Sequence, residues 1–231
     1  MQSIKRHEYF LASRLVSDGL LHLLFAIDPR LRVRGEGLHS SGSIIPCHSP
    51  LKPMMLTHIL TCPLLCLRKL LLLQDGIKTG SELLDCGCGV GGPMRNIARF
   101  TGANVTGITI NQYQVNRGNE LNAQAGLKNQ CKSIQGDFMR LPFPDNHFDG
   151  VYAIEATCHA PDRTKVFSEI LRVLKPGQVF ACYEWCLTDK YDKTNPDHGL
   201  IKKQIEEGDG LPDTAYTWEM DEALRKVSCT T

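Results

Sequence analysis

The stretch LLDCGCGVGGP, Leu83–Pro93, decides the fold. A short apolar strand over Glu82–Asp85 leads into it, and the helical pattern PMRNIARF follows it. Gly87, Gly89 and Gly92 satisfy the spacing G-x-G-x-x-G, which lets a nucleotide approach the backbone closely at a helix N-terminus. The stretch therefore predicts a nucleotide-binding strand–turn–helix unit, and a strand–turn–helix unit without a ligand is the alternative.

Strand and helix patterns alternate from Gly76 onward. Strands are expected over 105–110, 131–136, 148–155 and 179–185, and helices over 112–124 and 166–174. Repeated βα units of this kind predict an α/β fold, a doubly wound and mostly parallel sheet of the Rossmann-like type. In such sheets ligands bind beyond the carboxyl ends of the strands, where the strand order reverses.

The residues around the glycines favour one nucleotide cofactor over another. A nicotinamide or flavin dinucleotide calls for Asp or Glu at the end of the second strand, and VTGITIN ends in Asn111. Asp85 stands two residues before Gly87, where a carboxylate faces an ammonium group. This arrangement favours S-adenosylmethionine, whose methionine end carries an ammonium and whose sulfonium is cationic. A dehydrogenase is the distant alternative.

Composition excludes several classes of protein. At 42% hydrophobic and 22% charged residues, the 231-residue chain has enough apolar side chains for a sizeable core. Its formal charge of +1 provides no global positive field, so we expect no nucleic-acid partner. The ten cysteines follow a charged amphipathic start without an export signal, so we expect reduced thiols and an intracellular protein.

The N-terminal third has a different character. Apolar residues mixed with charges predict a packing helix over 3–15, and no steady periodicity follows up to Gln74. Residues 54–73 are long enough to suggest a membrane span, but Pro63 and two charges interrupt them. His58, Cys62 and Cys66 imitate metal-ligand spacing, yet a structural or accidental cluster is the preferred interpretation, and we expect no metal.

Several motifs together resemble those of class I methyltransferases, in the family's order and spacing. They are DCGCGVGG at 85–92, GD at 136–137, LPFPDNHFDGVYAIEA at 141–156 and LRVLKPGQVF at 171–180. More narrowly, three segments resemble sterol 24-C-methyltransferases: GITINQYQV at 107–115, YAIEATCHAP at 152–161 and YEWCLTDKYDKTNPDH at 183–198. IKRHEYFLASRL, at 4–15, resembles the helix that this family places before its glycine-rich strand.

The resemblance implies a methyl transfer from S-adenosylmethionine to carbon 24 of a sterol side chain, a step of sterol biosynthesis. It implies a sterol partner and peripheral attachment to the cytoplasmic face of the endoplasmic reticulum membrane, and it is compatible with a homo-oligomer. A methyltransferase for another acceptor, such as a phospholipid head-group amine or a quinol, and a catalytically inactive fragment are the alternatives.

The chain departs from the family pattern in three places. Residues 16–75 have no counterpart, and we expect an anomalous, poorly ordered or irregular insertion there, explained by a translated intron or an error in the gene sequence. The family's aromatic sterol-associated start would lie before Met1, and residues 214–231 correspond to a truncated C-terminal region. The methyltransferase core is expected over 76–213.

The resemblance also implies roles at matching positions. The cofactor is expected against Asp85, Gly87, Gly89, Thr109, Ile110, Gln114, Asp137 and Phe138. Glu155, His159 and Glu184 are the candidate catalytic residues, because the carbocation formed by methylating an alkene must lose a proton to a weak base. Tyr152, Tyr183 and Trp185 are the candidate substrate-binding residues, because their aromatic faces steady a cation. As alternatives, Glu155 only orients the cofactor, His159 is a loop histidine and Trp185 belongs to the core.

Overall fold

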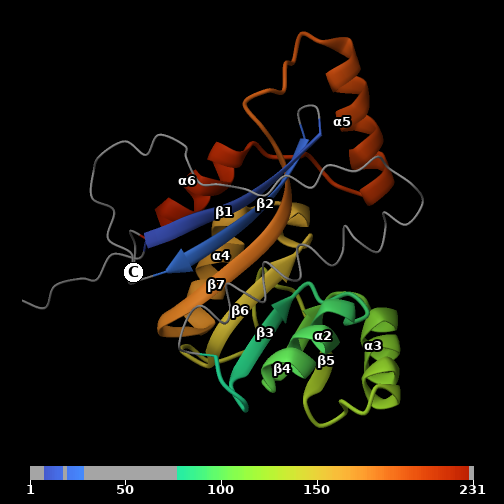
Figure 1. Cartoon of the computed structure of the whole chain (residues 1–231), viewed down its shortest axis with the longest axis vertical. Helices are drawn as coiled ribbons and strands as arrows, with labels where there is room; N and C mark the ends of the chain where they lie inside the picture. The colour runs from blue at the N-terminus through green and yellow to red at the C-terminus, as the bar shows by residue number, and fades with distance from the viewer. Residues whose placement is uncertain (1–7, 18–19, 29–76, 229–231) are drawn as a thin grey trace, which may run out of the picture.

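The structure is a computed structural model that describes residues 8–17, 20–28 and 77–228 (Figure 1). One seven-stranded sheet runs through it in the order β1-β2-β7-β6-β3-β4-β5. The strands are β1 Glu8–Ser17, β2 Leu20–Asp28, β3 Glu82–Cys86, β4 Asn104–Thr109, β5 Cys131–Gln135, β6 Phe148–Ile154 and β7 Leu174–Leu187. The helices are α2 Gly92–Thr101, α3 Gln112–Gln124, α4 Arg163–Val173, α5 Pro196–Asp209 and α6 Thr217–Ser228, with a 3-10 turn, η1, over Thr157–His159.

Five of these strands form a parallel sheet. β3 pairs with β4 on one side and with β6 on the other, β4 pairs with β5, and β6 pairs with β7, all in parallel. The chain builds outward from β3 to β5 and then returns to the other side of β3, so the strand order reverses there. The predicted doubly wound, Rossmann-like fold is confirmed. In such sheets ligands bind where the strand order reverses, so we expect the ligand at the carboxyl ends of β3, β4 and β6.

Most element boundaries lie within three residues of their predicted positions. α3 has the predicted bounds, and α4 begins three residues earlier than expected because the Asp162 side chain accepts a hydrogen bond from the Lys165 amide, at 3.0 Å, and caps it. β7 begins at Leu174, five residues before the predicted strand. A register shift in its pairing with β6 accommodates Pro176 and Gly177.

Two apolar layers cover the two faces of the sheet. On one face, Met94 and Ile97 of α2 pack with Leu83 and other buried side chains of the strands. On the other face, residues of α4 and α6, such as Phe167 and Leu224, pack with Leu84 and its neighbours. The alternation of Leu83 and Leu84 between the two layers is the period-two pattern of a strand buried on both sides.

The N-terminal segment forms a hairpin. β1 and β2 pair antiparallel with each other, and β2 pairs antiparallel with β7, from Leu20 opposite Leu187 to Ile27 opposite Phe180. The predicted helix over 3–15 is therefore wrong from Glu8 onward, and the predicted irregular insertion is wrong over 20–28. The local amphipathic pattern misleads because the backbone groups along the edge of β7 are satisfied by strand pairing. Residues 29–76, which include the interrupted apolar stretch over 54–73 and the cluster of His58, Cys62 and Cys66, lie outside the described residues.

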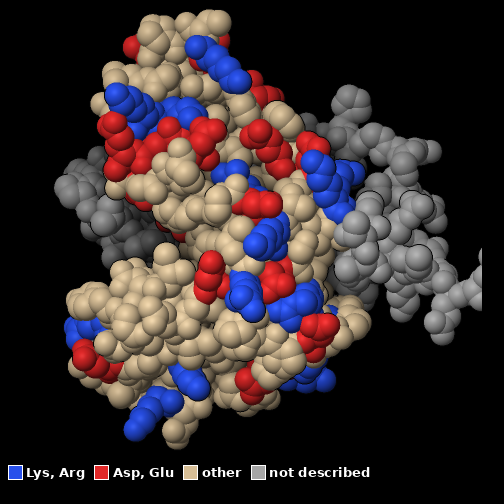
Figure 2. All heavy atoms as spheres, turned by 180° about the vertical axis from the view of Figure 1, so that it is seen from behind, with Lys and Arg blue, Asp and Glu red and all other residues tan. Residues whose placement is uncertain are grey.

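The C-terminal helices differ in how they attach. α6 belongs to the core, whereas α5 stands apart from the sheet in Figure 1 and contributes no buried side chain. An ion pair from Lys202 to Asp213, at 2.6 Å, holds α5 to the loop that follows it, and Lys202 also pairs with Glu206 within the helix. On the face shown in Figure 2, acidic and basic side chains lie intermixed, as a formal charge of +1 suggests. Within the described ranges, no helix has the length and hydropathy to cross a bilayer.

Candidate functional site

The glycine-rich turn lies at the carboxyl end of β3 and is tied to β4. The amides of Gly87 and Cys88 both donate to the Ile108 carbonyl, at 3.0 Å each. Gly87 has a φ of 79°, and a Cβ there would overlap the methyl group of Ala156. Gly89 has a φ of 53° and faces open space. The turn is thus packed tightly on one side and open at Gly89, where a ligand can approach the backbone.

Asp85 is the most unusual polar group at this turn. Its side chain is 2% exposed, and its Oδ2 atom has no hydrogen-bond partner among the described residues. Burial raises the pKa of Asp85 to about 7, although the hydroxyl of Tyr152 on the neighbouring strand acts in the opposite direction. A buried carboxylate oxygen without a donor is costly, and a cationic ligand group beside it would both pair with it and lower its pKa.

The helix after the turn adds further donors. α2 begins at Gly92, and its N-cap, Gly91, has a φ of 75° and provides no side chain to accept the amides of the first turn. Unpaired amides at a helix N-terminus favour an anionic or carbonyl group of a ligand. The turn therefore offers an acceptor for a cation in Asp85 and donors for an anion in α2, a combination that suits an amino acid.

The end of β4 brings together two predicted cofactor residues. The Thr109 hydroxyl donates to Oε1 of Gln114 at 2.6 Å, while Ile110 between them is 71% exposed. Asn111 caps α3, since its Oδ1 accepts from the amides of Tyr113 at 2.9 Å and Gln114 at 3.3 Å. The side-chain oxygen of Asn111 is therefore committed to the helix.

The end of β5 approaches the glycine-rich turn. Phe138 is partly buried against the core, and its ring lies 4.0 Å from the position that a Cβ on Gly87 would take. Asp137 is exposed, and its Oδ1 accepts from the Met139 amide at 2.8 Å. The predicted cofactor residues Asp85, Gly87 and Phe138 therefore lie at one edge of the sheet. Their contact with a ligand stays a prediction.

The end of β6 has a strained backbone. Glu155 follows the strand in the left-handed region, with a φ of 51°, and its amide donates to the Tyr183 carbonyl at 2.7 Å. This conformation is uncommon for a residue with a side chain, and it occurs preferentially at functional sites. Glu155 is half-buried, and His159 is exposed at the end of η1. Both lie on the loop that packs against Gly87, as the predicted substrate side requires.

Glu184 has a different place from the one predicted. Its side chain is fully buried, and its two oxygens accept four hydrogen bonds from residues 156–158. A carboxylate whose lone pairs are occupied by protein donors is not available to a substrate proton, so the structure does not support a catalytic base at Glu184. Sequence analysis missed Thr157, whose hydroxyl is one of these donors, because a single threonine in a loop has no distinguishing pattern.

The candidate substrate aromatics also lie deeper than predicted. Tyr152 is fully buried and Tyr183 is 4% exposed, and both belong to the apolar layer beneath α2. Their rings fill the core because successive residues of a strand that is covered on both faces point alternately into the two layers, and both tyrosines point into the layer beneath α2. They therefore do not present aromatic faces to a substrate. Trp185 is half-buried and stays a candidate.

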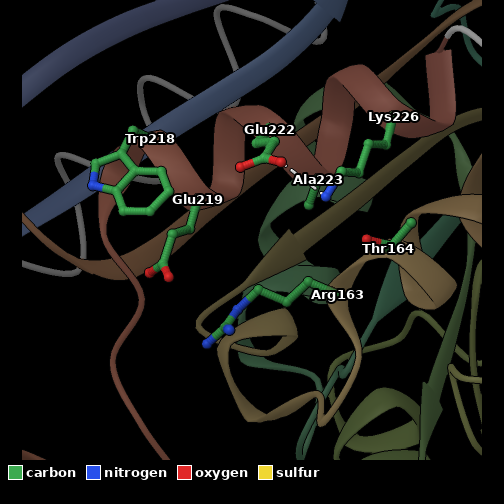
Figure 3. A pocket seen from close by; sticks show the side chains of 7 residues that line it. All are labelled: Arg163, Thr164, Trp218, Glu219, Glu222, Ala223 and Lys226. Carbon is green, nitrogen blue, oxygen red and sulfur yellow. Dashed lines mark ion pairs between the residues drawn. The ribbon is translucent and has the colours of Figure 1, made fainter.

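A cavity of about 370 Å³ lies away from the glycine-rich turn, between the start of α4 and one side of α6 (Figure 3). Its lining includes Arg163, Trp218 and the ion pair between Glu222 and Lys226, at 2.8 Å. Sequence analysis singled out none of these residues. Since positive and negative side chains alternate around it, the cavity shows no single ligand chemistry.

Comparisons with known proteins concern the part of the chain that carries this site. Residues 84–182 match the family described as a methyltransferase domain. The crystal structure of geranyl diphosphate C-methyltransferase from Streptomyces coelicolor superposes with a TM-score of 0.61 over 70% of this chain and 56% of that one, at 22% identity, which shows a shared fold. The parallel sheet and the glycine-rich turn therefore have the class I methyltransferase fold.

Relatives of known name show which methyltransferases the chain is similar to in sequence. The chain is 56% identical to cycloartenol-C-24-methyltransferase of Arabidopsis thaliana over 157 residues, 68% of this chain and 47% of that protein. It is 58% identical to sterol 24-C-methyltransferase of Yarrowia lipolytica over 137 residues, 59% of this chain and 36% of that protein. Over these spans the chain is similar to sterol 24-C-methyltransferases, the family that the motifs resemble. The chain spans less than half the length of these two relatives.

Proposed function

We propose that this chain binds S-adenosylmethionine at the glycine-rich turn and transfers its methyl group to carbon 24 of a sterol side chain. The observation that carries the cofactor is the buried Asp85 carboxylate, whose Oδ2 atom lacks a partner directly before an open, positive-φ glycine turn. The relative from Arabidopsis thaliana, named for methylation of cycloartenol at carbon 24, supports the acceptor.

The residues present fit this cofactor. Asp85 would hold the ammonium of the methionine portion, and the amides at the start of α2 would hold its carboxylate. Thr109 and Gln114 would lie along the ribose, and Asp137 would accept a hydrogen bond from the adenine amino group. When bound, the cofactor supplies an electrophilic methyl group on a sulfonium.

The chain's own residues would then manage the acceptor. An alkene that takes up a methyl group becomes a carbocation, so the protein must exclude water and provide a weak base for the proton that leaves. Glu155 is our candidate for that base, because it is half-buried and held at the carboxyl end of β6 by a strained backbone. His159, which is exposed on the same loop, is the second candidate.

A sterol acceptor has a consequence for location. Sterols reside in bilayers, so we propose that the protein associates peripherally with the cytoplasmic face of the endoplasmic reticulum membrane. Flotation of the protein with sterol-containing vesicles tests the association, and size-exclusion chromatography in the same buffer measures whether copies of the chain assemble.

Radiolabelled S-adenosylmethionine and a panel of Δ24 sterols test the proposal. We expect label in a methylated sterol, and we expect Glu155→Gln to abolish the product while leaving the affinity for S-adenosylhomocysteine within about threefold. Label in an amine or a phenol, with none in any Δ24 sterol, would establish the acceptor class of a different methyltransferase. No binding of S-adenosylhomocysteine by folded protein would refute the cofactor assignment.

A further inference from the structure

The buried carboxylate of Glu184 collects donors from a single turn of the loop after β6. Its Oε1 accepts from the amide of Ala156 at 3.3 Å, from the amide of Thr157 at 2.8 Å and from the Thr157 hydroxyl at 2.7 Å. Its Oε2 accepts from the amide of Cys158 at 3.2 Å. Three consecutive amides and one hydroxyl thus converge on one side chain of the neighbouring strand.

This turn contacts both halves of the candidate site. It begins directly after Glu155, whose left-handed backbone is held by its amide bond to the Tyr183 carbonyl. It also carries the Ala156 methyl group, which occupies the space that a Cβ on Gly87 would need. A movement of the turn would therefore shift Glu155 and the glycine-rich turn together.

Glu184 has the chemistry of an anchor. Hydrogen bonds to an ionised acceptor are about twice as strong as neutral ones, and a buried network holds one geometry only when every member has its partners. The turn is also attached from the other side, because Nη2 of Arg163 donates to the carbonyls of Cys158 at 3.5 Å and Asp213 at 3.1 Å. The loop after β6 is thus fixed between β7 and α4.

We propose that Glu184 is a positioning residue of this site: it holds residues 155–158 so that Glu155 lies at the carboxyl edge of the sheet and Ala156 closes against Gly87. It neither touches the substrate nor accepts its proton. The effect on methyl transfer rests on the proposed function, whereas the effect on the cofactor turn does not depend on the acceptor.

Two sets of variants test the anchor. Glu184→Gln keeps the shape of the side chain but removes its charge and places an amide donor against the donors of the loop. Thr157→Val removes the hydroxyl without changing the shape, and Thr157→Ser keeps the hydroxyl. Asp149→Asn is the matched control, because Asp149 is also a carboxylate that accepts hydrogen bonds from neighbouring strands. It accepts from the Glu82 amide at 2.9 Å and from Nζ of Lys175 at 2.6 Å. Asp149 lies at the opposite end of β6 from the candidate site.

We expect Glu184→Gln to weaken S-adenosylhomocysteine binding by about tenfold in calorimetry and to lower kcat for a Δ24 sterol by tenfold or more, because small displacements of reacting groups cost one to two orders of magnitude. Thr157→Val should show a smaller loss of both and Thr157→Ser should remain near the parent. Asp149→Asn should stay within about twofold in both, whatever its thermal stability. Hydrogen exchange of the amides at 156–158 should accelerate in Glu184→Gln and not in Asp149→Asn.

The shape of the kcat–pH profile separates positioning from proton transfer. Under the proposal, Thr157→Val and Glu184→Gln lower the profile without removing a limb, because the titrating group lies elsewhere. Loss of a limb in Glu184→Gln alone would make Glu184 the base and overturn the proposal, as would Glu184→Gln or Thr157→Val behaving like Asp149→Asn. If Glu184→Gln does not fold, the comparison of Thr157→Val with Thr157→Ser tests whether the hydrogen bonds to Glu184 position the loop. If the parent methylates no Δ24 sterol, the proposed function fails, and binding and exchange still decide the role of Glu184.

Discussion

Replacing Asp85 with Asn should make the ligand-free protein more stable at pH 8 while removing its affinity for the cofactor. Burial raises the pKa of Asp85 from 3.8 to about 7, so the folded protein retains a proton that the unfolded chain releases. An acid whose pKa is raised on folding destabilises the fold when it is ionised. The loss of unfolding free energy begins above the unfolded pKa near 4 and is complete above pH 7. Between pH 5 and pH 8 this one group should cost about 3 kcal/mol of unfolding free energy.

Urea denaturation of the parent and of Asp85→Asn at pH 5, 6, 7 and 8 measures this cost. Asparagine is neutral throughout, so the stability difference between the two proteins should grow with pH by about 3 kcal/mol, and contributions from all other groups cancel. Asp149→Asn is the control. Partial burial acts to raise the pKa of Asp149, but the bonds from Lys175 and the Glu82 amide outweigh it and lower the pKa, so this variant should differ from the parent by a constant amount over this range. A difference for Asp85→Asn that does not change with pH would refute a raised pKa at Asp85.

Three further predictions concern the same edge of the sheet. The affinity of the parent for S-adenosylhomocysteine should rise about tenfold from pH 6 to pH 8 and level off above pH 8, because Asp85 must lose its proton to pair with the ammonium; calorimetry of Asp85→Asn should show weak, pH-independent binding. Gly87→Ala should cost about 3 kcal/mol or more of unfolding free energy, because the new methyl group overlaps Ala156 in a left-handed backbone. Gly89→Ala meets open space and should cost only about 1 kcal/mol. Equal costs of the two variants in thermal denaturation would contradict the contact between Gly87 and Ala156. Asn111→Ala should cost about 1 kcal/mol through loss of the cap of α3, measured by chemical denaturation, and no loss would mean that the cap is not formed in solution.

The parallel part of the fold was predictable because each of its elements carries its own local signal. Residues 112–124 show a helix pattern between an Asn cap and a loop, and the structure has the same bounds. The hairpin of β1 and β2 was not predictable in this way. Residues 8–17 have the spacing of an amphipathic helix, and they form a strand of a hairpin that joins the sheet through β7, more than 140 residues further along the chain. Local periodicity carries no information about such a partner.

The candidate site was predictable at the glycine-rich turn and less so beyond it. Gly87 and Asp85 are recognised by their spacing, and the structure gives each a reason for its identity, a contact with Ala156 and a missing donor. Tyr152 and Tyr183 looked equally suitable for a substrate surface, because a sequence shows the chemistry of a side chain and not which layer of the sheet it enters. Burial of both rings decides against that role.

The two buried carboxylates of this edge show how the distribution of donors separates binding from positioning. Asp85 and Glu184 both end up with almost no exposed surface, and either would pass as an acid–base candidate from its place near a motif. Glu184 accepts four hydrogen bonds from the chain itself, so its charge is committed to the loop after β6. Asp85 retains an oxygen without a donor among the described residues, so a ligand that supplies a donor would recover the free energy of its burial. Urea denaturation at pH 8 should therefore give opposite signs for the two variants: Asp85→Asn gains stability and Glu184→Gln loses it.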